Sequence, residues 1–351
     1  MTRRGIITAV IAGGALLLGA LFFIFILDKD TRYPAEKEDS TGVSDIARMT
    51  DAQRIRIVFT GDVMLSRTVG AKMEQKSDFG YPARKIAGFF KDADIVVVNF
   101  EGPMSDRGTN VGSKYSFRAD PRAVETLKLL NVSVASLANN HMWDYGRDAL
   151  MDTASILEAN GILPVGAGKD YAAANALKVR EVNGIKIGFL SYTDLYPANL
   201  SAGPDSPGVS SFDLERAVAE TKARKDPLSS AVATGEKADI LVVLFHWGEE
   251  YQPHPTQEQK NIAHSLIDAG ADMVVGHHPH VAQDIEEYNG KWIFYSLGNF
   301  IFDQYFSTST MQGLVVEAFI EEGRVKEVKV WESFLNREYE VERLTPKDLT
   351  F

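Results

Sequence analysis

Short apolar segments rich in Val and Ile recur along this chain, and amphipathic stretches separate them. The segment at 94–100, DIVVVNF, is apolar almost throughout, which is typical of a strand buried on both faces. Similar spacing predicts further strands at 55–60, 132–137, 239–245 and 272–276, and helices at 121–130, 147–160 and 256–269. This alternation predicts an α/β fold with mixed sheets flanked by helices.

Three turn signals add antiparallel strands to this pattern. Asn183-Gly184 divides the segment 177–191 into a hairpin, and Asn289-Gly290 and Glu322-Gly323 mark two more. Residues 197–211, rich in Ser, Pro and Gly, are expected to form a loop. Because no linker interrupts the pattern, we expect residues 53–340 to form one domain, followed by a C-terminal tail at 341–351.

The N-terminus carries an uncharged apolar run at residues 6–27. A run of that length suffices to span a bilayer as a helix. Arg3 and Arg4 precede it, so the positive-inside rule keeps a stub at 1–5 in the cytoplasm and places the domain outside. A cleaved signal peptide is the alternative, although the run ends in large apolar residues. The polar segment 28–52 is predicted to be a tether, which gives a single-pass protein of the cell membrane.

The amino-acid composition limits the kinds of chemical site that this chain can contain. The chain of 351 residues has no cysteine, which excludes disulfides, zinc–thiolate sites and cysteine nucleophiles. Its formal net charge of −11 argues against a nucleic-acid partner. Any metal site must therefore use His, Asp, Glu and Asn.

Polar side chains follow five of the predicted strands, where each strand ends. In open α/β sheets, ligands bind outside the carboxyl ends of the strands. Each motif alone has an ordinary explanation, such as a turn, a helix cap or a core histidine. Together they have the composition of a divalent-metal site. The motifs are Gly61-Asp62, Asn99-Phe100-Glu101-Gly102, Asn139-Asn140-His141, His246-Trp247-Gly248 and Gly276-His277-His278-Pro279-His280.

Other polar residues are less distinctive. His254 and His264 are expected to be structural or solvated, and His277 could be merely a neighbour of the ligand pair. Asn299 either borders the site and binds substrate or belongs to a packed turn. Cationic residues near the motif loops could bind carboxylates or phosphates, with solvated surface charge as the alternative: Arg67, Lys114 and Arg118.

At these motifs, together with Gly61–Met64, Asp144-Tyr145-Gly146 and Tyr295–Phe300, the sequence resembles the CapA family of capsule-synthesis proteins, called PgsA in bacilli. The resemblance covers about residues 54–305 and the apolar N-terminus. It implies a membrane-anchored component of poly-γ-glutamate synthesis. It further implies a four-layer α/β/β/α sandwich like that of calcineurin-like metallophosphoesterases.

The same resemblance implies roles for individual residues. Glu101 would be a carboxylate that bridges two metals, and His141, oriented by Asp144, would be the catalytic acid or charge stabiliser. Met64 stands where the superfamily has a histidine ligand, so the first metal would lack one ligand. The cofactor would be one or two divalent transition-metal ions, Mn, Fe or Zn. The remaining implied ligands are Asp62 and His280 for the first metal, and Asn140, His246 and His278 for the second.

Three functions follow as hypotheses. The first is a membrane-anchored component of poly-γ-glutamate biosynthesis or export, whose metal site binds or processes the polymer. Its partners would be a polyanionic or cell-envelope polymer, the membrane and a polyglutamate synthase complex. The second is a secreted metal-dependent hydrolase of phosphoesters or cell-wall amides. The third is a non-catalytic scaffold of a polymer synthase complex.

Overall fold

The computed structural model describes residues 54–196, 198–225 and 236–349, which belong to one compact unit, Met49–Phe351. The predicted membrane segment at 6–27 and the tether at 28–52 lie outside the described residues. Within the described part of the chain, no helix has the length and hydrophobicity needed to cross a membrane.

Two mixed sheets form the framework. The first has the strand order β16-β15-β14-β1-β2-β3-β4, with β13 beside the end of β1, and the second has the order β11-β12-β10-β9-β7-β6. The first contains β1 (Ile55–Val63), β2 (Ile95–Phe100), β3 (Val134–Ser136), β4 (Leu163–Val165), β13 (Asn299–Ile301), β14 (Gln312–Glu321), β15 (Arg324–Leu335) and β16 (Val341–Lys347). The second contains β6 (Lys178–Val182), β7 (Ile185–Thr193), β9 (Ile240–His246), β10 (Met273–His277), β11 (Ile285–Tyr288) and β12 (Lys291–Phe294). A small sheet pairs β5 (Ala167–Gly168) with β8 (Gly208–Val209).

Helices fill the connections between strands. The α-helices are α2 (Arg67–Lys76), α3 (Ala87–Phe90), α4 (Val124–Leu129), α5 (Gly146–Ala159), α6 (Tyr171–Ala174), α7 (Leu214–Lys225) and α8 (Gln257–Asp268). Three 3₁₀ turns add η1 (Tyr81–Ala83), η2 (Pro121–Ala123) and η3 (Ala198–Leu200).

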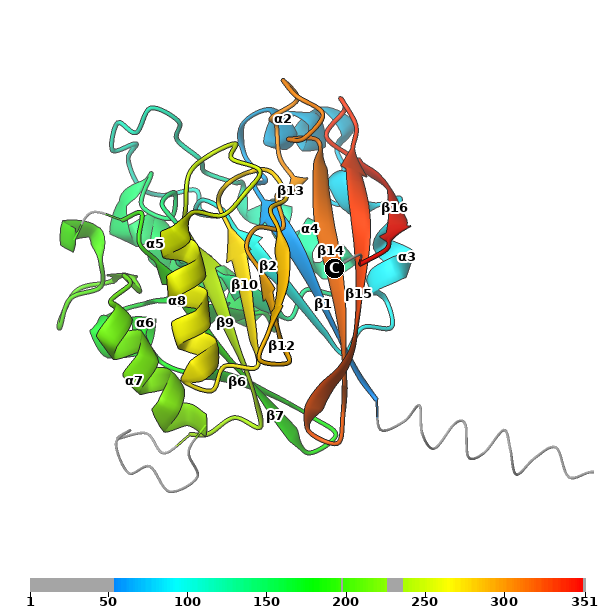
Figure 1. The fold of residues 1–351 in the computed structure, drawn as a ribbon. Helices are drawn as coiled ribbons and strands as arrows, with labels where there is room; N and C mark the ends of the chain where they lie inside the picture. Colours follow the sequence, from blue (N-terminus) through cyan, green and yellow to red (C-terminus); the bar gives the residue numbers. More distant parts are fainter. Residues whose placement is uncertain (1–53, 197, 226–235, 350–351) are drawn as a thin grey trace, which may run out of the picture. The chain divides into compact units, whose positions relative to one another are not determined.

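The packing places the two sheets face to face between helices. Phe59 and Val97 of the first sheet share one core with Val242 and Phe294 of the second. The outer face of the first sheet packs on α2, α3, α4 and α5, and that of the second on α7 and α8. Figure 1 shows β14, β15 and β16, in orange to red, at one edge of the first sheet, and α7 and α8 on the other side of this unit. The α/β class predicted from the sequence is therefore confirmed.

Local sequence explains most element boundaries. The Asn183-Gly184 turn takes left-handed φ values of 52° and 79° and joins β6 to β7, as predicted. Helix α8 begins after Thr256, whose hydroxyl accepts from the Gln259 amide in a capping box. The helix predicted from Pro121 begins as the 3₁₀ turn η2, and the Asp120 side chain caps it.

The structure differs from the sequence-based expectation at two places. Residues 341–347, expected to be part of a tail, form β16 and pair antiparallel with β15, and Val341 is fully buried. The first sheet thus extends beyond the predicted boundary at residue 340. The segment 197–211, expected to be a loop, contains η3 and β8.

Candidate metal centre

The ends of the parallel strands bring the predicted motifs together. Asp62 in β1 lies in register with Asn99 in β2 on one side and with Asn299 in β13 on the other. In the second sheet, His246 of β9 lies in register with His277 of β10. The chain continues directly from these positions to Glu101 and to His278, so side chains from both sheets meet at one end of the fold.

Asp62, Glu101 and His280 form the innermost group. One potential ligand atom of each lies within 4.8 Å of the others, and all three residues are buried. His280 Nδ1 lies 3.3 Å from Asp62 Oδ2, and His280 Nε2 lies 3.9 Å from Glu101 Oε1. Two carboxylates and an imidazole at this spacing form a donor set suited to a divalent metal ion.

Glu101 is the residue that most requires a cation. Both of its carboxylate oxygens are buried and have no hydrogen-bond partner. Burial raises the pKa of Glu101 well above its ordinary value, and the neighbouring Asp62 adds to the rise. A buried carboxylate without a donor is unfavourable unless a proton or a metal ion neutralises it. The residues present therefore fit a metal at this position.

Attraction between the carboxylates and the imidazole shifts the pKa values of His280 and Asp62. Burial alone would lower the pKa of His280, but the carboxylates of Glu101 and Asp62 raise it to about 9. Burial would raise the pKa of Asp62, but the hydrogen bond and charge of His280 lower it. The two carboxylates of this group thus stabilise a positive charge placed between them.

Asn140, His246 and His278 form a second group beside the first. His246 Nε2 lies 2.9 Å from Asn140 Oδ1, and the rings of His246 and His278 are 4.8 Å apart. His278 Nδ1 is buried and has no partner. Burial lowers the pKa of His278 to about 3 and that of His246 well below its usual range, so both rings are neutral, the form that binds metals.

The backbone of the His278-Pro279-His280 motif is strained. His278 and His280 adopt φ values of 98° and 58°, which are rare for residues with a side chain. Such strain persists only where the surrounding structure enforces it, and it gathers at functional sites.

Asn99 links the two groups, a role that the sequence analysis missed. Its Nδ2 donates to Asp62 Oδ1 at 2.8 Å and lies 3.3 Å from His246 Nδ1. Asn139 in turn donates to Asn99 Oδ1 and to the Phe100 carbonyl. The available signal was the position of Asn99 at the end of β2, in register with Asp62.

His141 and Asp144 form the predicted pair. His141 Nδ1 lies 2.7 Å from Asp144 Oδ2, and Asp144 also accepts from the Ser113 hydroxyl and the Phe117 amide. The Phe117 ring stacks on His141 with centroids 3.8 Å apart. These contacts hold the ring so that His141 Nε2 lies 3.7 Å from Glu101 Oε1.

The remaining predicted residues separate into different environments. Asn299, expected to bind substrate, is buried: its Oδ1 lies 3.0 Å from His280 Nδ1, and its amide donates to Gln304 and to the Thr310 carbonyl. Arg67 lines a cavity beside His141 and His280. Arg118 instead donates to the backbone carbonyls of Arg107 and Gly108 and lies over the Tyr145 ring, away from that cavity.

The other histidines and Met64 have structural surroundings. His277 Nε2 contacts the Thr60 carbonyl, His264 pairs with Glu286, and the exposed His254 lies beside Asp284. The Met64 sulfur accepts hydrogen bonds from the amide and hydroxyl of Ser66, inside the hydrophobic core.

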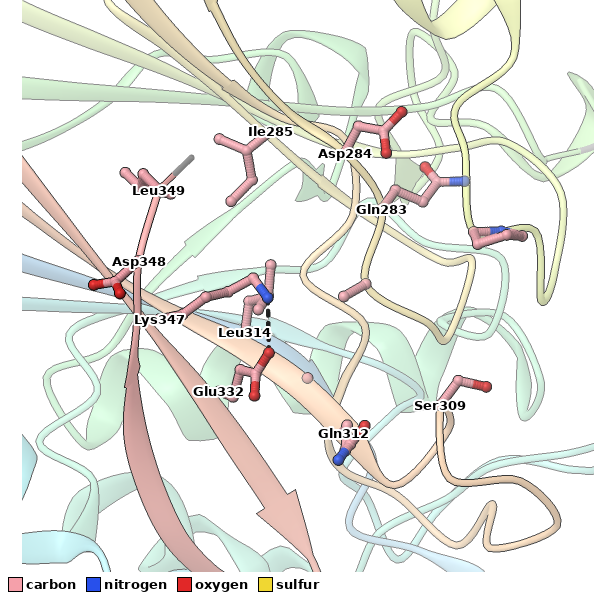
Figure 2. A pocket seen from close by; sticks show the side chains of 13 residues that line it. Gln283, Asp284, Ile285, Ser309, Gln312, Leu314, Glu332, Lys347, Asp348 and Leu349 are labelled. Atoms are coloured by element: carbon pink, nitrogen blue, oxygen red, sulfur yellow. Dashed lines mark hydrogen bonds and ion pairs between the residues drawn. The ribbon is translucent and has the colours of Figure 1, made fainter. Parts of the chain in front are cut away.

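Two cavities differ in whether they adjoin the cluster, which is the name used here for the first group (Asp62, Glu101 and His280) and the second group (Asn140, His246 and His278) together. One of about 210 Å³ includes His141 and His280 in its wall. A larger one of about 560 Å³ lies between β14–β16 and the segment before β11, and Figure 2 shows Lys347 paired with Glu332 at its wall. The larger cavity shares no lining residue with the cluster, whereas the smaller one lies directly beside the candidate metal centre.

The fold and the site together define a two-sheet α/β protein with a buried carboxylate–histidine cluster at its strand ends. The chain belongs to the family of the bacterial capsule synthesis protein PGA_cap, whose family model matches residues 56–304. This confirms the resemblance inferred from the motifs.

Three relatives illustrate the similarity. The PGA biosynthesis protein CapA of Bacillus subtilis is 36% identical over 263 residues, which is 73% of this chain and 66% of that protein. The capsule biosynthesis protein CapA of Bacillus anthracis is 33% identical over 267 residues, 75% of this chain and 63% of that protein. A probable polyglutamine synthesis accessory protein of Mycobacterium tuberculosis is 32% identical over 251 residues, 70% of this chain and 65% of that protein. The match thus spans slightly less than two-thirds of each relative.

Proposed function

We propose that this protein is a membrane-anchored accessory component of poly-γ-glutamate synthesis, and that its cluster binds or processes the polymer outside the cytoplasm. Membership in the capsule-synthesis family supports the biological role, as do the names of the relatives. A relation to calcineurin-like metallophosphoesterases, expected from the motifs, is part of this proposal.

The observation that carries the proposed metal site is the pair of buried, unpartnered oxygens of Glu101. Glu101, Asp62 and His280 would hold one divalent ion, and Asn140, His246 and His278 a second. Oxygen and imidazole donors without thiolates suit Mn, Fe or Zn. When bound, such a metal supplies Lewis-acid activation of water and of the bond to be cleaved.

The protein's own residues would contribute positioning and proton transfer. Asp144 holds the Nδ1 side of His141, which leaves Nε2 facing the cluster as the atom that gives or takes a proton. This arrangement also supports the second candidate function, a metal-dependent hydrolase of phosphoesters or cell-wall amides.

The Met64 environment bears on the number of ions. Its sulfur is directed to Ser66, so the first position has three protein ligands, Asp62, Glu101 and His280. The second position would have Glu101 as a shared ligand in addition to Asn140, His246 and His278. We therefore expect the second position, with two neutral histidines, to retain metal more tightly. A non-catalytic scaffold would require neither position for polymer production.

The decisive experiment replaces His278 by Ala in a cell that makes the polymer. We expect the purified variant to lose the ion of the second position by elemental analysis and the cell to stop producing polymer. His254→Ala is the matched control, because its side chain is 77% exposed and lies outside both groups. Normal polymer production by a His278→Ala protein that lacks this ion would reject the metal-dependent role of the second position and favour the scaffold.

The proposed location is tested separately. We expect the full-length chain to sediment with membranes, and external protease to degrade its domain in cells stripped of their wall. Protection from protease in intact stripped cells, with degradation after lysis, would contradict the orientation inferred from Arg3 and Arg4.

A further inference from the structure

The wall of the cavity at the cluster contains the guanidinium group of Arg67. Among the described Lys and Arg residues, only Arg67 lines it. The Arg67 Nε lies 3.2 Å from Asp303 Oδ2, and that carboxylate also accepts from the Thr68 amide. The Arg67 guanidinium lies 5.3 Å from the Phe117 ring centroid and 5.8 Å from that of Tyr115, and its contact with Asp303 is through Nε. Its two terminal nitrogens form a pair that can bind a carboxylate in a bidentate manner.

The backbone at Arg67 is held in a strained conformation. Its φ of 51° is uncommon for a residue with a side chain. Together with the buried Asp303, whose side chain is 1% exposed, this fixes the base of the guanidinium at the cavity wall. Strain of this kind, maintained by surrounding contacts, points to a functional position.

Aromatic side chains surround the same opening. Tyr115, Tyr251 and Phe306 are exposed by 52%, 40% and 65%, although large apolar side chains usually gain by burial. Phe306 meets Tyr251 edge to face at 5.2 Å. The rim therefore offers apolar contact to the aliphatic carbons of a ligand.

Size and charge limit what can enter. The volume of about 210 Å³ is below the roughly 300–1,000 Å³ of pockets for drug-sized ligands. Glu250 also lines the cavity, so several anionic groups at once would be repelled. One carboxylate-bearing residue satisfies both limits.

Building on the proposed function, we infer that this cavity is a one-residue subsite. It holds a single carboxylate-bearing residue of the polymer, with the carboxylate on Arg67 and the aliphatic carbons against the rim formed by Tyr251 and Phe306. Neighbouring residues of the chain stay outside the cavity. Affinity should then depend on the carboxylate and scarcely on the length of the chain.

The test measures binding of γ-linked glutamate oligomers to the full-length, Mn-loaded protein by calorimetry. We expect a dimer and an octamer to bind with dissociation constants that agree within about threefold when ligand concentration is expressed per glutamate residue. Oligomers whose carboxylates are converted to carboxamides should bind roughly ten- to hundredfold more weakly, because they lose the charge-assisted contact.

Substitutions of cavity residues test whether this cavity causes the dependence of binding on the carboxylate. Arg67→Gln should weaken oligomer binding roughly ten- to hundredfold and abolish the preference for carboxylate over carboxamide, with metal content unchanged. Phe306→Ala should weaken binding by a smaller factor. Arg118→Gln is the matched control and should bind like the wild type, because Arg118 lies outside the cavity.

Several results would overturn the subsite. They are affinity per glutamate residue that rises steadily with oligomer length, equal binding of carboxamide oligomers, unchanged binding by Arg67→Gln, or no binding by the loaded wild type. The proposed function is judged independently by polymer production in the His278→Ala cell. A failed subsite and a failed function therefore give different results.

Discussion

At the scale of single residues, the Glu101 carboxylate is buried beside Asp62 without a hydrogen-bond donor. We predict that Glu101→Gln binds no metal at the first position. In the presence of a chelator, the free energy of unfolding of the variant should equal that of the wild type or exceed it by up to about 3 kcal/mol, because the substitution removes a buried carboxylate that has no hydrogen-bond donor. Denaturant unfolding with chelator and with Mn checks both statements. Full metal content in Glu101→Gln would contradict the assignment of this carboxylate.

The His141–Asp144 pair makes a second residue-scale prediction. Asp144→Asn removes the anionic acceptor that fixes His141 Nδ1, so polymer processing should slow by about a hundredfold or more while metal content stays unchanged. Ser113→Ala is the control, because it removes one hydrogen bond to Asp144 Oδ1 without touching His141. An equal loss of rate in both variants would indicate that Asp144 only supports the loop.

At the scale of elements, β1 and β13 approach each other closely at Gly61. A Cβ at Gly61 would lie 1.9 Å from the Gly298 carbonyl oxygen, and this contact sets the register that places Asp62 opposite Asn299. We predict that Gly61→Ala lowers the free energy of unfolding by about 3 kcal/mol and weakens metal binding. Gly88 in α3 is the control, because a Cβ added there would meet no atom within 4 Å. Gly88→Ala should leave the free energy of unfolding unchanged or raise it by up to about 1 kcal/mol. Equal stability of the two variants would disprove the close approach.

At the scale of the whole molecule, the candidate centre joins the two sheets. Asp62 comes from the first sheet, whereas His246 and the segment after β10 come from the second. A metal present at a hundred times its dissociation constant stabilises the native state by about 2.7 kcal/mol. We therefore predict that chelation lowers Tm by about 5 °C, measured by calorimetry, and that Mn restores it. The His278→Ala/His280→Ala protein should not respond to either reagent, and a response of that variant would place the stabilising ion elsewhere.

Sequence patterns alone predicted the central strands of both sheets, the hairpin turns and the end of the sheets at which the site lies. These features are local, because apolar spacing and Asn-Gly turns act within a few residues, and the carboxyl ends of parallel strands necessarily coincide. The resemblance implied that Asp62 and His280 share one group, and the structure brings them together. The position of Asn99 between Asp62 and His246 was found only in the structure, as was the placement of Arg67 at the cavity while Arg118 lies apart. The tertiary structure also made residues 341–347 an edge strand. These outcomes depend on sheet order and on the paths of loops between distant segments, which no local pattern encodes.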